Sequence, residues 1–319
     1  DEIREGTQTV FKTPGIRCDV PALKAAEESG AEITSEMELF FETCPCKIIA
    51  VTGSDGKTTT TSLIYEMLKA AGYTCHLGGN IGKPLVAEVG DIKADDVCVV
   101  ELSSFQLHTM KRSADIAVVT NVTPNHLDWH TDFDEYKNSK KAVFKYQKSG
   151  GRVVLNYDND ITREFGKETD NAVYFSRKEI LDNGFCLIGD KVVRRINGRD
   201  EREVLDINNI FIPGMHNVEN YMAAAAAVEG LAEDGIIRRT AIDFKGVPHR
   251  IEFIREVDGV KYYNDSIASS PARTTAGLNS FGDKKVILIA GGYDKKIPFD
   301  DFGKVVCDHV KALVLVGVT

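Results

Sequence analysis

The sequence lacks the features of a membrane protein, a secreted protein or a nucleic-acid-binding protein. No apolar run approaches the ~20 residues needed to cross a bilayer, and the longest, Val286–Ala290 and Ala312–Val316, have the length of buried strands. The first ten residues are polar and acidic, so we expect no signal peptide. Acidic residues outnumber basic ones by 48 to 39, and the resulting charge of −9 argues against a nucleic-acid partner.

Cysteine is also scarce. The chain has seven cysteines in 319 residues, and they are too scattered for a disulfide framework. Cys44 and Cys46 form the only close pair, and no second Cys/His pair follows at ligand spacing. The sequence therefore predicts no zinc site, and this use of cysteine favours a reduced, cytoplasmic compartment.

What the chain does contain is an alternation of short β-branched runs with helical patterns. The length predicts two or three domains, and the alternation is typical of α/β proteins with parallel sheets. We expect strands at Lys47–Val51, Val97–Glu101, Ile116–Asn121 and Arg152–Asn156. We expect helices at Thr58–Ala71, Thr131–Gln147 and Asn217–Ala232.

Two later segments change character. Residues 171–212 are rich in charges and Asn-Gly turns, which predicts a small antiparallel excursion. Gly246–Pro248 is a plausible linker, and beyond it Asp258-Gly259 predicts a hairpin before the α/β pattern resumes. The polar N-terminus has no obvious first strand, and the chain stops after an apolar run where a helix would normally follow. We interpret the chain as part of a longer protein.

A glycine-rich loop follows the first of these strands. Residues 52–60, TGSDGKTTT, lie between the strand and the helix that begins near Thr58. Glycines at 53 and 56 let backbone N–H groups turn inward, Lys57 can reach phosphates, and the Thr58 hydroxyl can join a Mg²⁺ shell. The strict phosphate-loop pattern is not met, because Val51 holds the place of its first glycine. The context nevertheless favours a nucleotide phosphate site over a solvated turn.

This loop resembles the ATP loop of the Mur ligases, the ATP-dependent amide-bond-forming enzymes of bacterial cell-wall synthesis, and of the related folylpolyglutamate synthases. Further motifs follow in the family's order: GGNIGKP at 78–84, ELSSFQL at 101–107, TNVTPNHLDWH at 120–130, GMHNVEN at 214–220, HRIE at 249–252 and NDSIASSP at 264–271. The resemblance covers nearly the whole chain. The chain departs from the family's usual pattern at Asn125, where Asp is common, and at Ile267, where Lys is common.

The resemblance implies an α/β protein of three domains. Residues 1–47 would be a remnant of an N-terminal Rossmann-like domain that binds a UDP-linked substrate. Residues 48–247 would be a central ATP-binding domain with a P-loop-type parallel sheet, and residues 248–319 an incomplete Rossmann-like domain that binds an amino acid. It also implies ATP and Mg²⁺ as cofactors and a monomeric enzyme. The substrates would be UDP-N-acetylmuramoyl-L-alanine and D-glutamate, joined through an acyl phosphate.

Two candidate metal ligands follow strands of the predicted sheet. Glu101 ends an apolar strand at its C-terminal edge, where α/β sheets place ligands, and a carboxylate near phosphates suits Mg²⁺. A charged residue where a strand surfaces is the alternative. His126, after the next strand, is a weak candidate on its own, and the resemblance implies that it is a metal ligand.

Lys140 is the most informative lysine. At ~100° per residue, it falls near the centre of an apolar helical stripe, whereas Lys141 and Lys145 face away. Burial of the amine should lower its pKa, unless the side chain extends to solvent. The resemblance implies a carbamylated lysine here, and a neutral amine is the form that reacts with CO₂. The stripe consists of Phe133, Tyr136, Val143 and Phe144.

The resemblance assigns roles to further residues. The catalytic residues would be Lys57, Glu101, His126 and Lys140, and the Mg²⁺ ligands Thr58, Glu101, His126 and Lys140 as its carbamate. The ATP-binding residues would be Gly53, Ser54, Asp55, Gly56, Lys57, Thr58, Thr59, Asn217, Asn220, His249, Arg250 and Asp265. The substrate-binding residues would be Thr13, Pro14, Gly15, Asn80, Ser103, Gln106, Ser269 and Lys295.

Several of these assignments have plainer alternatives. Asn217 can simply cap a helix, and Lys295 can be an exposed lysine. Arg250 would stabilise phosphoryl charge only after domain closure. Two rival functions remain open: a folylpolyglutamate-synthase-like ligase, and a nucleotide-binding module without ligase activity.

Overall fold

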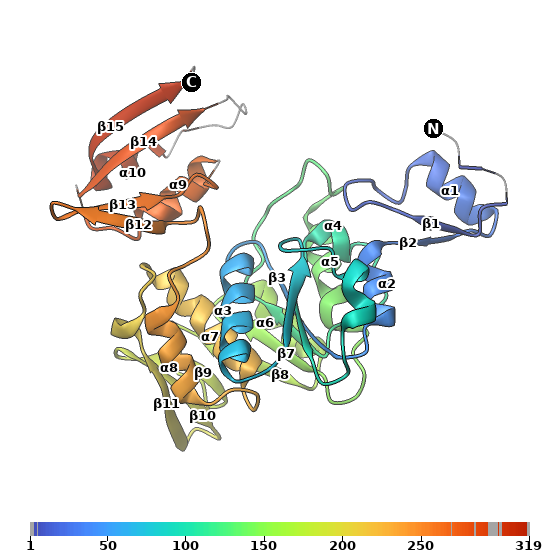
Figure 1. Ribbon diagram of the computed structural model, residues 1–319, viewed down its shortest axis with the longest axis horizontal. Helices are drawn as coiled ribbons and strands as arrows, with labels where there is room; N and C mark the ends of the chain where they lie inside the picture. Colours follow the sequence, from blue (N-terminus) through green and yellow to red (C-terminus); the bar gives the residue numbers. More distant parts are fainter. Residues whose placement is uncertain are drawn as a thin grey trace. The chain divides into compact units, whose positions relative to one another are not determined.

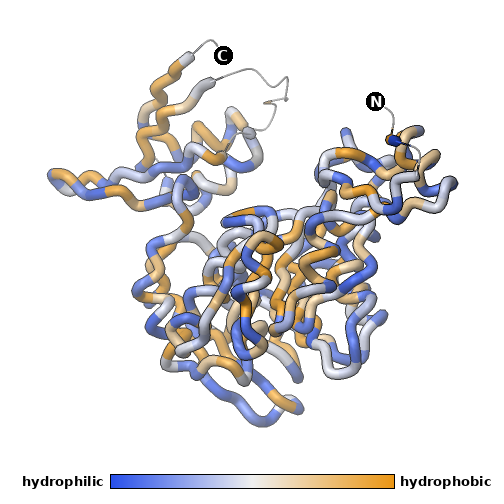
Figure 2. Tube along the Cα trace, turned by 45° about the vertical axis from the view of Figure 1, so that its right-hand side comes forward, coloured by the Kyte–Doolittle hydropathy of each residue, from blue (hydrophilic) through white to orange (hydrophobic). Residues whose placement is uncertain are grey.

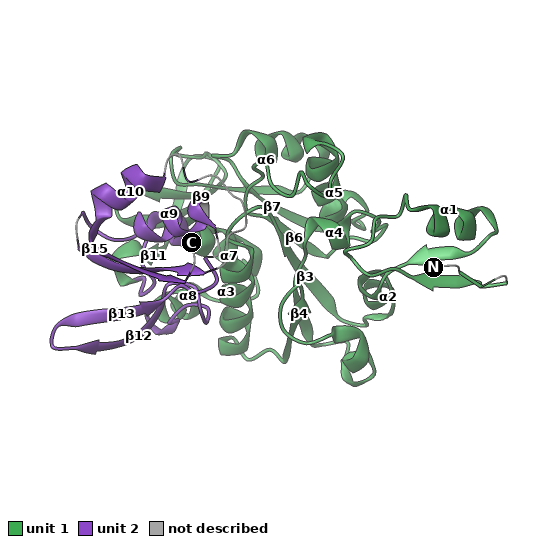
Figure 3. Cartoon of the chain, turned by 90° about the horizontal axis from the view of Figure 1, so that it is seen from above, with its two compact units in different colours: residues 1–209, 219–241 green, residues 210–218, 242–319 purple. Residues whose placement is uncertain are grey.

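The computed structural model describes residues 3–4, 6–268, 270–283, 285–292, 299 and 302–317. The chain divides into two compact units (Figure 3): residues 1–209 with 219–241, and residues 210–218 with 242–319. Within the described ranges, no helix combines the length and apolarity that a membrane span requires. The expected division into three domains stays a prediction.

A nine-stranded sheet forms the centre of the first unit, in the order β11-β10-β9-β8-β7-β6-β3-β5-β4 (Figure 1). Neighbouring strands from β4 to β9 in this order pair in parallel. The last two pairs, β9–β10 and β10–β11, are antiparallel. The chain goes from β3 to one side of the sheet, for β4 and β5, and then to the other side for β6. Ligands of α/β sheets bind at such a reversal of strand order, beyond the carboxyl ends of the strands. The sheet strands of this unit are β3 (Lys47–Thr52), β4 (Cys75–Gly79), β5 (Val97–Glu101), β6 (Ile116–Val119), β7 (Arg152–Asn156), β8 (Ala172–Ser176), β9 (Gly184–Ile188), β10 (Lys191–Ile196) and β11 (Asp200–Asp206).

Apolar strands and the helices on both faces form the core. Strands β5 and β6 are buried along their whole length, as expected for parallel strands covered on both faces. Hydrophobic residues follow the central strands, whereas hydrophilic residues dominate the outer loops (Figure 2). The helices of this unit's α/β part are α3 (Lys57–Ala70), α4 (Ser104–Leu107), α5 (Phe133–Lys145), α6 (Asp160–Phe165) and α8 (Asp234–Asp243), with short 3₁₀ turns η1 (Leu85–Asp91), η2 (Gly166–Glu168) and η3 (Ile207–Asn209).

Most strand and helix predictions are confirmed. The predicted strands at 97–101 and 152–156 have the bounds of β5 and β7, and the helix expected over 131–147 is α5, capped by Asp132. The helix expected over 217–232 is α7, which runs over Met215–Val228. The antiparallel prediction for 171–212 is right for β9 to β11 and wrong for β8. Because α6 supplies a crossover, β8 instead extends the parallel sheet beside β7.

The N-terminal segment contains strands that the sequence analysis missed. Strand β1 (Thr9–Phe11) pairs in parallel with β2 (Glu32–Thr34), and the helices α1 (Pro21–Glu28) and α2 (Glu36–Thr43) follow them in turn. The expectation that this polar stretch forms no first strand was therefore wrong. Each strand has only three residues, too few to show a period of two.

The second unit begins with the predicted hairpin. Strand β12 (Glu252–Val257) pairs with β13 (Val260–Asn264) around Asp258-Gly259. Helix α9 (Pro271–Leu278) has Ser270 as its N-cap and proline at its start, as helix N-termini favour. Strand β14 (Val286–Gly292) pairs in parallel with β15 (Val310–Gly317), and α10 (Phe302–His309) precedes β15.

The C-terminus of α7 gives a stability prediction. The Arg152 guanidinium on β7 donates to the carbonyls of Ala226, Ala227 and Glu229, at 3.2, 3.3 and 2.8 Å. These carbonyls lack helical partners, and charged donors at such ends are stabilising. Arg152→Ala is expected to lower the free energy of unfolding by about 2 kcal/mol, measured by urea denaturation. Lys148→Ala removes an exposed charge nearby and should change it by less than about 0.5 kcal/mol. Equal stability of the two variants would contradict this role for Arg152.

Candidate active site

The glycine-rich loop at residues 52–60, called the phosphate loop after its predicted role, leaves the carboxyl end of β3 with a backbone that only glycine adopts easily. Gly53 has φ +149° and Gly56, the N-cap of α3, has φ +80°. A Cβ at Gly53 would overlap the Thr120 hydroxyl, and one at Gly56 would overlap Oδ1 of Asn220. The strand–loop–helix arrangement predicted from the sequence is therefore present, with no room for side chains at the two glycines.

Residues just after β6 fix the path of this loop. The backbone N–H of Ser54 donates to the carbonyl of Asn121 at 2.9 Å, and that of Asp55 donates to Oδ1 of Asn121 at 2.9 Å. The Thr120 hydroxyl donates to the carbonyl of Asp55 at 2.6 Å. The loop is thus anchored on the strand beside its own, which holds its backbone in one conformation.

Two lysine side chains converge on the carbonyl oxygen of Gly53. Nζ of Lys57 lies 3.1 Å from it and 3.0 Å from the carbonyl of Ser54. Nζ of Lys140, on α5, donates to the same oxygen at 2.9 Å. The structure therefore brings together two lysines that lie far apart in the sequence, as the candidate-site prediction requires.

Lys140 is 1% exposed and among the largest fully buried side chains of the described chain. Burial holds its pKa well below the ordinary value, the nearby charge of Lys57 lowers it further, and Asp55 opposes the shift. The predicted inward face of α5 is confirmed. Lys141, by contrast, points outward and pairs with Glu168 at 2.6 Å.

Tyr136 connects α5 to the phosphate loop. Its hydroxyl lies 2.8 Å from Oγ of Ser54, and its ring centroid lies 4.5 Å from Nζ of Lys140. Oγ of Ser54 also donates to the carbonyl of Thr123 at 2.9 Å and accepts from the backbone N–H of Thr123 at 2.9 Å. One buried hydroxyl therefore joins the loop, α5 and the segment after β6.

Glu101 lies at the carboxyl end of β5 and is 1% exposed. Its Oε1 accepts from Nδ2 of Asn80 at 2.7 Å, whereas its Oε2 is buried and has no hydrogen-bond partner within the described part of the chain. A buried carboxylate oxygen without a partner is costly. A hard cation that prefers oxygen ligands would satisfy it, so this carboxylate fits Mg²⁺.

His126 lies on the loop after β6 with φ +55°, an unusual conformation for a side chain of its size. It is exposed, and its ring contacts Phe105 of α4 at 4.9 Å between centroids. Phe105 follows Glu101 closely in the chain, so His126 lies over the segment that carries the carboxylate. Its role as a ligand remains a prediction.

The predicted substrate residues of the N-terminal segment lie against the same loop. Thr13, Pro14 and Gly15 are exposed, and the indole N–H of Trp129 donates to the carbonyl of Gly15 at 3.0 Å. The two nitrogens of Arg17 pair with both carboxylate oxygens of Glu135, at 2.9 and 3.1 Å. Hydrogen bonds from Arg17 lower the pKa of Glu135, so this ion pair is retained at acidic pH.

Three predicted substrate residues have structural partners. Ser103 and Gln106 form a capping box at the start of α4, with each side chain bound to the other's backbone N–H. Asn80 orients Glu101 through the bond described above. The sequence analysis missed these partnerships, although the spacing of Ser103 and Gln106 is a recognisable capping signal.

The nucleotide residues on α7 differ in their surroundings. Asn220 is buried, and its Oδ1 accepts from the Thr60 hydroxyl at 3.2 Å, beside Gly56. Asn217 donates to the carbonyl of Pro213 at 2.6 Å, so it caps the preceding turn. Thr58 and Thr59 lie in the first turn of α3, and Thr59 is buried.

Within the second unit, His249 has φ +64° and its backbone N–H donates to Glu252 at 2.7 Å. Arg250 follows it, and Oδ1 of Asp265 accepts from the backbone N–H of Ile251 at 3.0 Å. Burial raises the pKa of Asp265. The predicted substrate residues Ser269 and Lys295 lie outside the described residues.

Comparison with known proteins shows the family to which the chain belongs. Residues 51–228 match the Mur ligase middle domain. The chain belongs to the Mur ligase family, whose members are ATP-dependent ligases.

Several relatives bear the name UDP-N-acetylmuramoylalanine–D-glutamate ligase. The protein from Acetivibrio thermocellus is 59% identical over 99% of this chain and 67% of its own length. The protein from Clostridium novyi is 54% identical over 99% of this chain and 68% of its own length. In fold, the chain is similar to the UDP-N-acetylmuramate–alanine ligase of Thermotoga maritima, with a TM-score of 0.67 and 22% identity over 98% of this chain and 71% of that one.

The two left-handed glycines at the ends of α3 offer a test of the loop. Gly56→Ala is expected to reduce ATP affinity at least about tenfold, because strain adds to the displacement of Asn220. Gly72 has φ +93°, and a Cβ there would have nothing within 4 Å. Gly72→Ala should therefore cost only about 1 kcal/mol of stability and leave ATP binding intact. Calorimetric titration with ATP measures both variants, and normal affinity in Gly56→Ala would refute the close packing at this glycine.

Proposed function

We propose that this chain is the ATP-dependent ligase that joins D-glutamate to UDP-N-acetylmuramoyl-L-alanine in the synthesis of peptidoglycan precursors. The observation that carries the proposal is the placement of Lys140, a buried amine of lowered pKa that shares the carbonyl of Gly53 with the phosphate-loop lysine. A simple nucleotide-binding module has no need of a second lysine in that place. The two relatives described above, at 59% and 54% identity, support the choice of substrates.

The reaction must activate a weak acid. The carboxylate of UDP-N-acetylmuramoyl-L-alanine attacks the γ-phosphorus of ATP, which forms an acyl phosphate and releases ADP. The amine of D-glutamate then attacks the acyl carbon, and phosphate leaves as the amide forms. Such phosphoryl transfer depends mainly on positioning and on neutralisation of charge.

The phosphate loop supplies both. Backbone N–H groups at the start of α3 and the dipole of that helix favour the ATP phosphates. Lys57, whose Nζ lies beside the carbonyls of Gly53 and Ser54, would bind the β- and γ-phosphates as charge develops. Asn220, buried beside Gly56, restricts the conformations open to this end of the loop.

Glu101, Thr58, His126 and a carbamate on Lys140 would hold Mg²⁺. When bound, Mg²⁺ supplies positive charge to the phosphates and the acyl phosphate. The neutral nitrogen of Lys140 attacks the carbon of CO₂ and loses a proton, which converts a buried amine into a carboxylate-bearing side chain. Asn80 holds one oxygen of Glu101, so the other is left for the cation.

The proposed substrates are small molecules, and we propose a monomeric cytoplasmic enzyme. The exposed loop at residues 13–15 and the adjoining loop after β6 are proposed to hold the UDP-linked substrate, with Ser103 and Gln106 nearby on α4. The Arg17–Glu135 ion pair fixes the N-terminal segment in this place.

The choice of substrate is tested by product formation. The protein is expected to release ADP and phosphate when supplied with ATP, Mg²⁺, UDP-N-acetylmuramoyl-L-alanine and D-glutamate, and to be inactive with folate and L-glutamate. Lys57→Ala should abolish turnover while the circular-dichroism spectrum and melting temperature stay close to those of the parent. Turnover with folate, or normal activity of Lys57→Ala, would contradict the proposal.

Lys140 is tested by chemical rescue. Lys140→Ala is expected to lose activity by on the order of 100-fold or more, and added formate or acetate should restore part of it by supplying an oxygen anion. Lys141→Ala, on the outward face of the same helix, should stay active. ¹³C-NMR with labelled bicarbonate should show a carbamate in the parent and none in Lys140→Ala. An active Lys140→Ala enzyme without a carbamate signal in the parent would remove this role and leave the Lys57 assignment unaffected.

A further inference from the structure

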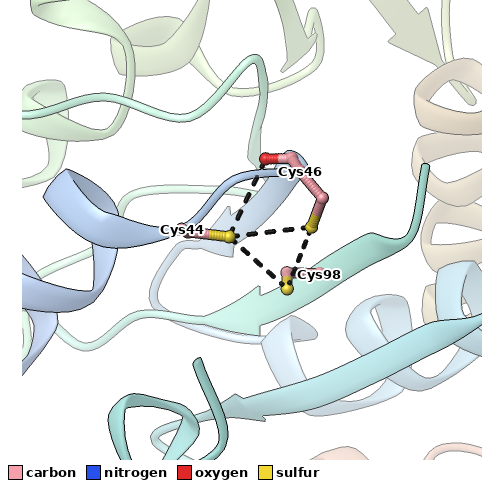
Figure 4. Close-up of side chains that lie close together, drawn as sticks. All are labelled: Cys44, Cys46 and Cys98. Carbon is pink, nitrogen blue, oxygen red and sulfur yellow. Dashed lines mark hydrogen bonds between the residues drawn. The ribbon is translucent and has the colours of Figure 1, made fainter. Parts of the chain in front are cut away.

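Three cysteine side chains meet at the amino-terminal end of strands β3 and β5 (Figure 4). Cys44 follows the last turn of α2, Cys46 precedes β3, and Cys98 comes from β5. The Sγ–Sγ distances are 3.6 Å between Cys44 and Cys46, 3.4 Å between Cys46 and Cys98, and 3.8 Å between Cys44 and Cys98. The pair that seemed isolated along the sequence therefore has a third partner in space.

The pairing of β3 with β5 explains why Cys98 lies beside Cys44 and Cys46. Strands β3 and β5 run side by side in parallel with Ile48 opposite Cys98. This register brings the first residues of both strands to the same end of the sheet, where α2 also ends. Cys98 is 52 residues from Cys46 in the chain, so no local spacing of cysteines predicts this contact.

The distances match those of ligands around one metal ion. Zinc–sulfur bonds of about 2.3 Å in a tetrahedron place the sulfur atoms about 3.8 Å apart. A disulfide would need about 2.05 Å between two of them, which leaves the third thiol unused. The nearly equal sides of this triangle therefore favour a shared ion over a single covalent pair.

The burial of the three thiols also suits such a site. Cys46 and Cys98 are buried, whereas Cys44 is half-buried and leaves one side open to solvent. The thiol of Cys44 donates to Sγ of Cys98 and lies within hydrogen-bond distance of Sγ of Cys46, so the outermost sulfur faces the two buried ones. A water molecule can complete the coordination from the open side.

We propose that Cys44, Cys46 and Cys98 together bind one thiophilic metal ion, with Zn²⁺ as the probe. The site is separate from the proposed Mg²⁺ site in both chemistry and place, because its ligands are sulfur atoms and it precedes β3, whereas the phosphate loop follows that strand. The bound ion would tie the end of α2 to the first residues of β3 and β5. Its effect is therefore on stability, since it links the N-terminal segment to the central sheet.

The test uses the chain in a buffer that keeps thiols reduced, after removal of metal by a chelator. Addition of Zn²⁺ is expected to give one bound ion per chain by native mass spectrometry. Co²⁺ in its place should give a thiolate-to-metal charge-transfer band and the strong visible bands of tetrahedral cobalt. The melting temperature should rise by on the order of 5 °C at a free Zn²⁺ concentration about 100 times Kd.

Serine variants decide whether these thiols are the ligands. Cys44→Ser, on the half-buried side, should fold normally and bind Zn²⁺ at least about tenfold more weakly, and Cys98→Ser should lose the cobalt charge-transfer intensity. Cys186→Ser changes a buried cysteine on β9 and should bind Zn²⁺ as the parent does. Ligase turnover of Cys44→Ser with Mg²⁺ and the proposed substrates should equal that of the parent.

Three results would overturn the site. These are a parent chain that keeps no Zn²⁺, a Cys44→Ser variant with unchanged affinity, and a parent whose mass is two hydrogens lower without bound metal, which would indicate a disulfide instead. None of them bears on the ligase assignment, which stands or falls with product formation.

Discussion

The carbonyl oxygen of Gly53 accepts hydrogen bonds from two lysine side chains, and the proposed chemistry depends on this shared acceptor. One of them, Lys140, is fully buried; burial disfavours the charged form of its amine, and the nearby charge of Lys57 disfavours it further. The lowered pKa of Lys140 is the expected result. A lowered pKa favours the neutral form of the amine, which is the form that the proposed reaction with CO₂ requires.

The surrounding residues keep this arrangement in place. Tyr136 and Ser54 link α5 to the loop, and Thr120 and Asn121 link the loop to the end of β6. Each of these hydrogen bonds joins residues that lie far apart in the sequence. The site is therefore built by the parallel sheet, which brings the ends of β3, β5 and β6 to one edge.

Much of this site was predictable because its signals are local. The loop between β3 and α3 shows its glycines and its lysine in consecutive residues, and the inward position of Lys140 follows from the helical period of its own segment. Glu101 was likewise predictable from its place at the end of an apolar strand. In each case, one segment carries the whole signal.

The rest depends on which segments meet. The bond between Asn80 and Glu101 joins the ends of β4 and β5, and the approach of Cys98 to Cys46 depends on the register of β3 and β5. No pattern within either segment reveals such a meeting. The three-residue strands β1 and β2 escaped prediction for a related reason, since pairing with each other, more than their own sequence, makes them strands.

The crowding at Gly53 has a consequence for inhibition of the enzyme. A side chain at this position would collide with the Thr120 hydroxyl, and the backbone angle of +149° is one that other residues rarely adopt. A compound that binds the backbone of this residue would therefore contact a position with almost no tolerated substitutions. Resistance to such a compound would have to arise elsewhere in its binding site, because a side chain at Gly53 would force the loop itself to shift.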